Sequence, residues 1–333
     1  MRRDSTDPPA YIALSGSGEL ERRAERAAAL LAACELCPRR CRVDRTSGAG
    51  GICGIGARAR VASYGPHHGE EAVLRGWAGS GTVFFGGCNL RCRFCQNEDI
   101  SHRPAGREVG PDRLAAVFLD LQGMGCHNLN LVTPSHVVPQ ILAALAIAAA
   151  RGLRLPVVYN SSAYDAVGTL ALLDGVVDVF MPDVKLLDAD LAELYLTARD
   201  YPDVARRAVT EMHRQVGDLV VGSDGLAVRG VLVRHLVMPG LVDESARVFA
   251  FLAGLSADTF VNVMGQSRPC AAAERAPDDL RTLARRTTRA EHIAALEAAR
   301  AAGLTRATHA WRARQRNRAT TRPGPCRGGA VVV

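Results

Sequence analysis

The sequence contains no apolar run of the roughly 18 residues that a membrane-spanning helix requires. Residues 1–9 also lack the apolar segment of a secretory signal. These two absences predict a cytoplasmic protein with no membrane partner. Because disulfides are disfavoured in the cytoplasm, the 10 cysteines among the 333 residues are expected to be metal ligands or buried thiols.

Acidic residues are missing from the last part of the chain. Residues 305–333 contain seven arginines and no Asp or Glu, and these seven charges equal the formal net charge of +7 of the whole chain. The rest of the chain is therefore close to neutral. The basic segment is rich in Thr, Gly and Pro and has too few apolar residues to fold alone. We predict a disordered Arg-rich tail at 306–333, with a contact to RNA or an acidic protein as the alternative.

Three cysteines, Cys88, Cys92 and Cys95, follow a short β-branched and aromatic run at 82–85 with C-x3-C-x2-C spacing. Thiolates select zinc, copper(I) or iron–sulfur clusters. Structural zinc needs four protein ligands, and a 4Fe–4S cluster usually has one cysteine for each iron. A cluster held by these three residues would keep one iron open for a ligand that is not protein. The alternative is a zinc knuckle with a fourth ligand such as His102 or Cys126.

Four more cysteines, Cys34, Cys37, Cys41 and Cys53, stand at C-x2-C-x3-C-x11-C spacing around a glycine-rich turn at 47–51. Four thiolates make a closed metal site with no open position for a substrate, which indicates a structural or electron-relaying role. Zinc and a second 4Fe–4S cluster both fit this spacing. Reduced thiols without a metal are a third interpretation.

From Gly81 onward, short β-branched runs alternate with longer helical patterns, which indicates βα units and a parallel sheet. The expected strands are 82–85, 128–132, 156–159, 177–181, 231–236 and 259–263. The expected helices are 111–124, 137–151, 164–173, 188–196, 202–215, 243–255 and 289–302. Six such repeats predict an α/β fold, a partial (β/α)6 TIM-like barrel with a small Cys-rich N-terminal extension.

This pattern divides the chain into four regions. We expect a loose N-terminus at 1–27, a Cys-rich metal-binding segment at 28–75, the partial barrel at 76–305 and the Arg-rich tail at 306–333. Residues 21–33, rich in Ala, Arg and Glu, are expected to form a helix that leads into the Cys-rich segment. The segment 64–71 contains two histidines and two glutamates and is interpreted as a connecting turn close to the mouth of the site.

Polar residues follow the ends of the expected strands. They are Thr133, Ser135, His136, Asn160, Ser161, Asp183, Lys185, His235, Asn262 and Gln266. In a βα barrel the carboxyl ends of the strands form the active site. The cysteine triplet follows the first strand, so these polar groups and the triplet are expected at one rim of the barrel.

The triplet spacing, with the aromatic Phe94 before the last cysteine, resembles the signature of the radical S-adenosylmethionine (radical SAM) enzymes. Most of residues 34–305 resembles a subgroup related to the pyruvate formate-lyase activating enzymes. The matching segments are Cys34-Glu35-Leu36-Cys37-Pro38, His68-Gly69-Glu70-Glu71, Gly79-Ser80-Gly81-Thr82, Cys95-Gln96-Asn97, Asn130-Leu131-Val132-Thr133-Pro134, Val158-Tyr159-Asn160-Ser161, Met181-Pro182-Asp183-Val184-Lys185 and Val237-Met238-Pro239-Gly240.

The resemblance implies a 4Fe–4S cluster on Cys88, Cys92 and Cys95, with SAM chelating the open iron. One electron, from a flavodoxin or ferredoxin, then cleaves the sulfonium and yields a 5′-deoxyadenosyl radical. The residues implied to contact SAM are Asn97, Thr133, Ser135, His136, Asn160, Ser161 and Asp183. No catalytic residue is assigned beyond these.

Three functions follow as hypotheses. The first is an activating enzyme that abstracts a hydrogen atom from a glycine Cα of a partner glycyl-radical enzyme. The second is a radical SAM enzyme that acts on a small molecule or on another macromolecule such as RNA. The third, from another class, is a non-catalytic iron–sulfur or zinc protein. The first two predict 5′-deoxyadenosine when the reduced protein is given SAM, and the third predicts none.

Overall fold

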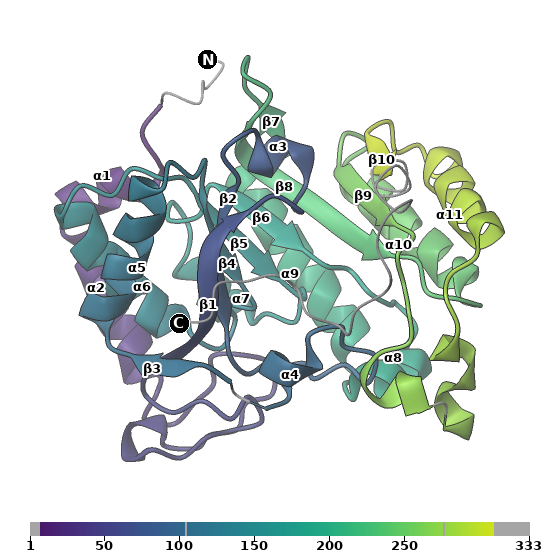
Figure 1. The fold of residues 1–333 in the computed structure, drawn as a ribbon, viewed down its shortest axis with the longest axis horizontal. Coiled ribbons are helices and arrows are strands. Elements are labelled where there is room, and N and C mark those ends of the chain that lie inside the picture. The colour runs from purple at the N-terminus through teal and green to yellow at the C-terminus, as the bar shows by residue number, and fades with distance from the viewer. Residues whose placement is uncertain (1–6, 104, 276, 310–333) are drawn as a thin grey trace, which may run out of the picture.

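The fold is built on one curved sheet, seen in the computed structural model of the protein (Figure 1). The structure describes residues 7–103, 105–275 and 277–309. The Arg-rich tail predicted at 306–333 therefore lies, from residue 310 on, outside the described residues. In the described part of the chain, no helix is long and apolar enough to cross a membrane.

The sheet has the strand order β10-β9-β8-β6-β5-β4-β2-β1-β3, and β7 pairs with β8 outside this path. The strands are β1 (Ala59–His67), β2 (Ser80–Phe85), β3 (Arg107–Val109), β4 (Leu129–Val132), β5 (Val157–Ser161), β6 (Val179–Pro182), β7 (Val220–Val221), β8 (Ala227–Leu236), β9 (Phe260–Met264) and β10 (Ala307–His309).

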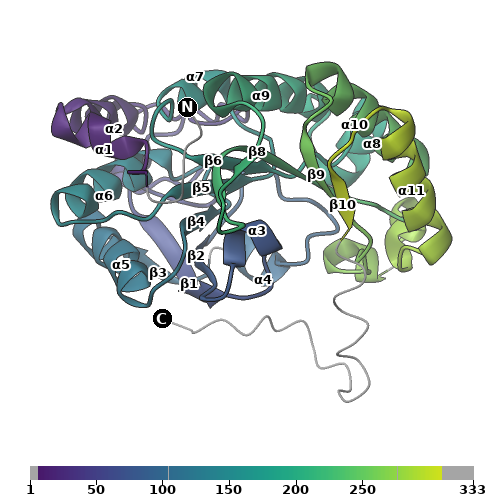
Figure 2. The same ribbon diagram turned by 90° about the horizontal axis from the view of Figure 1, so that it is seen from above.

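Helices surround this sheet. They are α1 (Tyr11–Gly16), α2 (Glu19–Ala29), α3 (Ala72–Arg75), α4 (Glu98–Ser101), α5 (Pro111–Gly123), α6 (Val138–Ala150), α7 (Val167–Ala171), α8 (Ala189–Leu196), α9 (Tyr201–Val216), α10 (Val242–Leu255) and α11 (Arg289–Ala301), with short 3-10 helices at Arg45–Ser47, Ala271–Arg275 and Asp278–Ala284. Figure 2 shows the longer helices on three sides of the strands and the short helices α3 and α4 on the fourth.

The partial barrel predicted from the sequence is confirmed. The six expected strands correspond to β2, β4, β5, β6, β8 and β9, which pair in parallel with their neighbours, and β10 continues the parallel series. On the other side of β2, β1 and β3 are antiparallel. Since β3 and β10 are the two ends of the strand order, the sheet does not close.

Continuous apolar runs form the central strands because both of their faces are covered. Every residue of β5 and of β6 is buried. The helix α6 is apolar around almost its whole circumference and is packed against by α1, α2 and α5.

The expected loose N-terminus at 1–27 is instead helical from Tyr11 onward. The side chains of Tyr11 and Leu20 are fully buried, and the Tyr11 hydroxyl donates to the carbonyl of Leu155 at 3.2 Å. The Ala10 N–H donates to the Asp178 carboxylate at 2.9 Å. The apolar face of these alanine-rich helices covers α6, which the sequence pattern alone did not indicate.

The segment 64–71, interpreted as a turn, contains the end of a strand. β1 continues to His67 and pairs with β2. The two glutamates that follow are turned inward, and the Glu70 side chain is only 8% exposed. This part of the chain therefore places charged groups inside the barrel.

Candidate functional site

The loop after β2 carries the cysteine triplet and passes very close to the Cys-rich segment. Gly87 has φ +79°, and a Cβ atom at this position would lie 2.4 Å from the carbonyl oxygen of Cys53. The Gly87 N–H donates to the carbonyl of Ile100 at 2.8 Å, which fixes the loop against the start of the next segment. A residue with a side chain could not take this path without displacing Cys53.

Two of the three thiols of this loop lie close to polar groups of the chain, one on the backbone and one on a side chain. The Leu90 N–H lies 3.4 Å from the Cys88 sulfur, and the Cys95 sulfur lies 3.1 Å from the Ser101 hydroxyl. Cys88 and Cys92 are buried. Burial raises the pKa of the Cys92 thiol, and the ammonium of Lys185 opposes this effect.

The triplet lines a cavity of ≈ 270 Å³ at the carboxyl ends of the strands. The other side chains that line it come from β2, β4, β5, β6, β8, β9 and the loops after them. They are Phe85, Phe94, Gln96, Asn97, Ile100, Ser101, Val132, Thr133, Asn160, Ser161, Ser162, Asp183, Lys185, Arg234, Leu236, Met264 and Gln266. The expected convergence of strand ends on one rim with the triplet is thus present in the structure.

Five of the seven residues predicted to contact SAM line this cavity, namely Asn97, Thr133, Asn160, Ser161 and Asp183. Thr133 has φ +59°, which is unusual for a β-branched residue, and its N–H donates to the Asn160 carbonyl at 2.9 Å. Strained backbone of this kind is concentrated at functional sites.

The other two predicted residues lie elsewhere. Ser135 is buried and does not line the cavity. His136 lies beside the Cys-rich segment, and its Nε2 atom is 2.9 Å from the Gly86 carbonyl oxygen. Burial lowers the pKa of His136 to about 4, so its ring is neutral near pH 7. These two residues turn back toward the core because the chain enters α6 directly after them.

Two further strand-end residues have structural partners. The Nδ1 atom of His235 is 2.8 Å from the Val184 carbonyl oxygen, and its Nε2 atom is 2.9 Å from the Ser245 hydroxyl. Asn262 donates to the Glu71 carboxylate at 2.7 Å instead of lining the cavity. Both side chains fix the sheet behind the site.

Arg234 is the main cavity residue that the sequence analysis did not identify. Its Nε atom donates to Asp183 at 2.7 Å, and its Nη2 atom donates to the Asn160 side chain at 2.8 Å. Lys185 lies on the other side of Asp183, with its Nζ atom at 3.0 Å. The alternation of side chains along β8 could have identified Arg234. Arg234 and Leu236 are two residues apart, so they lie on the same face of the strand, and both line the cavity.

The charges around Arg234 form a buried group. Burial alone would raise the pKa of Asp183, but Arg234 and Lys185 lower it to about 2. Glu70 lies 3.6 Å from Arg234. Burial and the nearby Glu70 raise the pKa of Glu71 to about 7, although Arg234 opposes this effect. Glu71 therefore titrates close to neutral pH at the inner side of the site.

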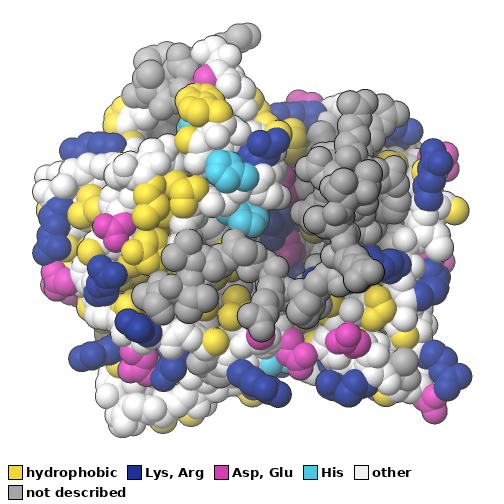
Figure 3. All heavy atoms as spheres, in the orientation of Figure 1, with side chains coloured by type: hydrophobic (Ala, Val, Ile, Leu, Met, Phe, Trp, Pro, Cys, Tyr) yellow, Lys and Arg dark blue, Asp and Glu magenta, His cyan; other side chains and the backbone are white. Residues whose placement is uncertain are grey.

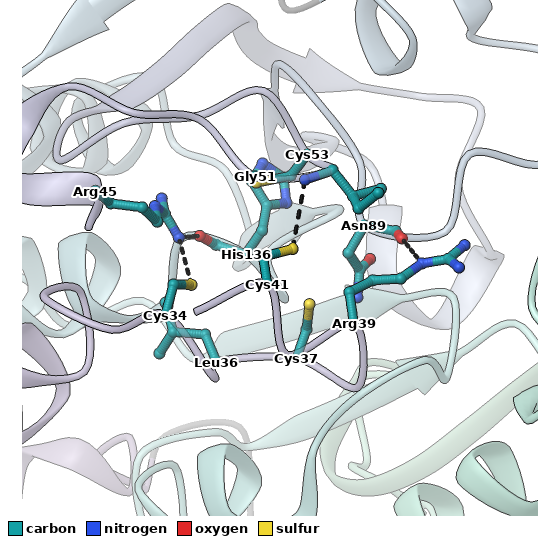
Figure 4. A pocket seen from close by; sticks show the side chains of 11 residues that line it. Cys34, Leu36, Cys37, Arg39, Cys41, Arg45, Gly51, Cys53, Asn89 and His136 are labelled. Atoms are coloured by element: carbon teal, nitrogen blue, oxygen red, sulfur yellow. Dashed lines mark hydrogen bonds between the residues drawn. The ribbon is translucent and has the colours of Figure 1, made fainter. Parts of the chain in front are cut away.

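The four cysteines of the N-terminal segment line a second, narrow cavity together with Arg39, Arg45, Asn89 and His136 (Figure 4). Cys34 and Cys37 are buried, and all four thiols are free. Burial raises the pKa of Cys37 to about 12, and the neighbouring thiols of Cys53 and Cys34 add to this effect.

The described residues contain no set of three or more His, Cys, Asp or Glu side chains placed to hold a single metal ion. A four-iron cluster makes a different demand. Each thiolate binds its own iron, so the sulfurs stay farther apart than around one ion.

Comparison with known proteins gives two matches. Residues 82–253 match the family model described as the radical SAM superfamily. An uncharacterised protein of Methanocaldococcus jannaschii is 32% identical over 288 residues, which cover 84% of this chain and 78% of the relative. The first match begins in β2 and ends in α10, so it includes the triplet and the cavity-lining ends of β2 to β8.

Proposed function

Because the chain belongs to the radical SAM superfamily, we propose that the triplet loop holds its 4Fe–4S cluster and that the enzyme abstracts a hydrogen atom from a glycine Cα of a partner protein. The superfamily membership makes the protein a radical SAM enzyme that uses SAM and a 4Fe–4S cluster and needs a one-electron reductant. The residues that hold the cluster and the substrate class are our proposal.

The donor set at the cavity fits a cluster with one open iron. Cys88, Cys92 and Cys95 line the cavity, and no fourth cysteine of the described residues does so. A 4Fe–4S cluster bound by three thiolates leaves one iron free for a ligand from solution. This convergence of three thiols on a cavity with a polar wall is the observation that carries the proposal.

Bound together, the cluster and SAM supply a carbon-centred radical that can abstract hydrogen. The protein contributes position and charge. Asn160 and Ser161, both buried, present polar groups to the cavity from β5. Asp183 offers a carboxylate to the SAM amino group, since its lowered pKa keeps it ionised. Lys185 places a positive charge beside the thiolates of the triplet.

The dimensions of the site favour a substrate that enters from outside. Small-molecule sites usually measure about 300–1,000 Å³, and the cavity of ≈ 270 Å³ has to take SAM before any substrate. The sheet does not close between β3 and β10, and we propose that a protruding polypeptide loop enters on this side. A glycine in such a loop offers a Cα–H bond with no side chain in the way.

The surface gives less support to an RNA substrate. On the face shown in Figure 3, basic and acidic side chains are interspersed and form no extended basic patch in the part of the chain that is described. RNA binding depends strongly on clustered Lys and Arg. We propose a flavodoxin or ferredoxin as the electron donor, and the cytoplasmic location stays a prediction.

Anaerobic reconstitution with iron and sulfide, followed by SAM and dithionite, tests the cluster ligands. The wild-type protein should form 5′-deoxyadenosine, and Cys92→Ala should reduce its formation by at least roughly 100-fold because one iron loses its thiolate. Cys126→Ala is the matched control, since Cys126 is buried but lies outside this cavity. Cleavage that survives in Cys92→Ala contradicts the assignment.

A deuterated peptide tests the substrate class. A flexible peptide with one α,α-dideuterated glycine should transfer deuterium to 5′-deoxyadenosine, as measured by mass spectrometry, and a protonated peptide serves as control. The glycine proposal is wrong if 5′-deoxyadenosine contains no deuterium at saturating peptide and a deuterated RNA or a deuterated small metabolite transfers its label instead.

A further inference from the structure

We propose that Cys34, Cys37, Cys41 and Cys53 hold a second 4Fe–4S cluster, packed against the loop that carries the first. This site lies outside the cavity of the proposed function. It is independent of which substrate that cavity serves.

The two cysteine groups have the same two spacings in opposite order along the chain. Residues 34–41 carry C-x2-C-x3-C, and residues 88–95 carry C-x3-C-x2-C, so both loops place three thiols within eight residues. A loop of this length can reach three corners of a cubane. In the N-terminal segment Cys53 adds a fourth thiol, whereas no fourth cysteine of the described residues lines the other cavity. A closed 4Fe–4S cluster, with one thiolate for each iron, therefore fits the N-terminal group. An open cluster fits Cys88, Cys92 and Cys95.

The backbone near Cys41 passes unusually close to the Cys41 sulfur. Arg40 and Arg42, on either side of Cys41, have φ +42° and +53°. Gly51 lies so close that a Cβ atom there would be 2.8 Å from the Cys41 sulfur, and the N–H of Ile52 lies 3.5 Å from the same sulfur. Strained backbone and N–H groups near sulfur are both typical of cluster sites.

The side chain of Arg45 supplies a second, independent observation. It is fully buried, and its guanidinium donates to the carbonyls of Gly56 and His136 and lies 3.7 Å from the Cys34 sulfur. No carboxylate of the described residues pairs with it. A buried cation without a counter-charge is unfavourable. Four cluster-bound thiolates would supply the missing negative charge.

The two cysteine sites share one stretch of backbone. Asn89, in the triplet loop, lines the second cavity, and Arg39 donates to the carbonyls of Asn89 and Leu90 at 2.9 and 3.0 Å. On the opposite side, the Cys53 carbonyl packs against Gly87. Figure 4 shows Arg39 and Asn89 side by side at the edge of the cysteine cavity. Two clusters held in this way are near neighbours, which favours iron over redox-inert zinc.

The decisive experiment uses the full chain with Cys88, Cys92 and Cys95 all changed to Ala, reconstituted anaerobically with iron and sulfide. We expect about four irons per chain and a 4Fe–4S electron paramagnetic resonance (EPR) signal after reduction. One zinc per chain with little iron, or neither metal, would overturn the proposal. The variant lacks the triplet, so this outcome does not depend on the proposed function.

The wild-type protein gives a second measurement if the triple variant does not fold. It should bind about eight irons. About four irons in a protein that still forms 5′-deoxyadenosine from SAM would contradict a second cluster, because the four irons would then belong to the triplet. When both clusters are reduced, their EPR signals should show spin–spin broadening that is absent from a Cys34→Ala/Cys37→Ala variant. Unbroadened signals at eight irons would refute the close packing of the two sites.

Arg45 offers a matched pair of variants in the triple-variant background. Arg45→Met should lower the iron retained after gel filtration several-fold, because the cluster loses its buried counter-charge. Arg26→Met should retain all of it, since Arg26 lies on α2 outside the cysteine cavity, is exposed and pairs with Glu19 at 2.7 Å. Equal iron retention by the two variants would contradict the role of Arg45.

Discussion

Two buried arginines distinguish the two cysteine sites. At the open, three-cysteine site, Arg234 lies within 4 Å of Asp183 and Glu70 and also bonds Asn160. At the closed, four-cysteine site, the polar partners of the Arg45 guanidinium among the described residues are carbonyl oxygens and one sulfur. The open site thus carries its own counter-charges in carboxylates, whereas the closed site has none apart from its thiols.

This difference teaches what each site depends on. The charges around Arg234 balance whether or not a cofactor is present, so the open site can bind and release SAM without losing its structure. The charge on Arg45 is balanced only by thiolates, and thiolates in a buried position need a metal. The closed site should therefore be stable only when loaded, while the open site should keep its shape between turnovers.

The largest expected effect comes from removing each arginine. Arg234→Met leaves Asp183 with Lys185 as its one remaining cation and removes the cation next to Glu70, which should lower the free energy of unfolding by about 3–5 kcal/mol in both loaded and metal-free protein. Arg45→Met should lower stability only in the loaded protein. In the metal-free protein it removes an unpaired charge and should be neutral or stabilising. Urea unfolding of each variant, with and without iron, measures all four values.

The comparison fails if Arg45→Met and Arg234→Met lower the free energy of unfolding of the metal-free protein by similar amounts. The charge of Arg45 would then be balanced without a metal. Arg42→Met, at an exposed position paired with Glu35, is the control for a lost arginine side chain. Its effect should stay within about 0.5 kcal/mol.

The contact between the two sites should be the next most sensitive feature. Gly87→Ala puts a methyl group where only 2.4 Å separates it from the Cys53 carbonyl, and it does so at φ +79°. We expect a loss of about 2–4 kcal/mol and a fall in the iron content of both sites, since neither loop can move alone. Gly125→Ala is the matched control, because Gly125 also has φ +79° but nothing within 4 Å of the added atom.

If Gly125→Ala destabilises the protein as much as Gly87→Ala, backbone strain explains the result and the two loops are not coupled. Iron lost from one site only would show that the loops move independently. The readouts are the iron count and the unfolding midpoint of the reconstituted protein.

The sequence predicted those features that depend on nearby residues. The triplet, its strand, the six βα repeats and the convergence on one rim all follow from local patterns and from the rules of parallel sheets. The contacts that it did not predict are between residues far apart in the sequence. Arg45 reaches the carbonyl of His136, which is 91 residues away, and Arg234 reaches Asp183, which is 51 residues away. The residues next to an arginine in the sequence do not indicate which distant group its side chain will contact.

Of the two N-terminal helices, only the second was predicted, as the helix at 21–33, and its burial was missed for a related reason. Only contact with α6 makes α1 and α2 part of the core. The two glutamates after β1 likewise read as solvated residues until the sheet brings Arg234 beside them.

The smallest expected effect is the pH dependence that Glu71 gives to the open site. Its pKa is raised to about 7 in the folded protein, above its ordinary value, so between about pH 4.5 and 7 the folded state holds a proton that the unfolded state has lost. Stability should therefore fall by about 1–3 kcal/mol as the pH rises through this range. Glu71→Gln, which keeps the bond to Asn262 but cannot titrate, should flatten the curve.

The closed site should not lose iron as the pH rises, because no carboxylate of the described residues pairs with Arg45 and thiolate ligands bind metal more tightly at higher pH. Urea unfolding followed from pH 5 to pH 8 measures the global dependence, and the iron retained by the triple-cysteine variant over the same range measures the closed site alone. A wild-type curve that stays parallel to that of Glu71→Gln would mean that Glu71 is ionised throughout. Arg234 would then be balanced by a full set of carboxylates at every pH, and the contrast with Arg45 would be sharper still.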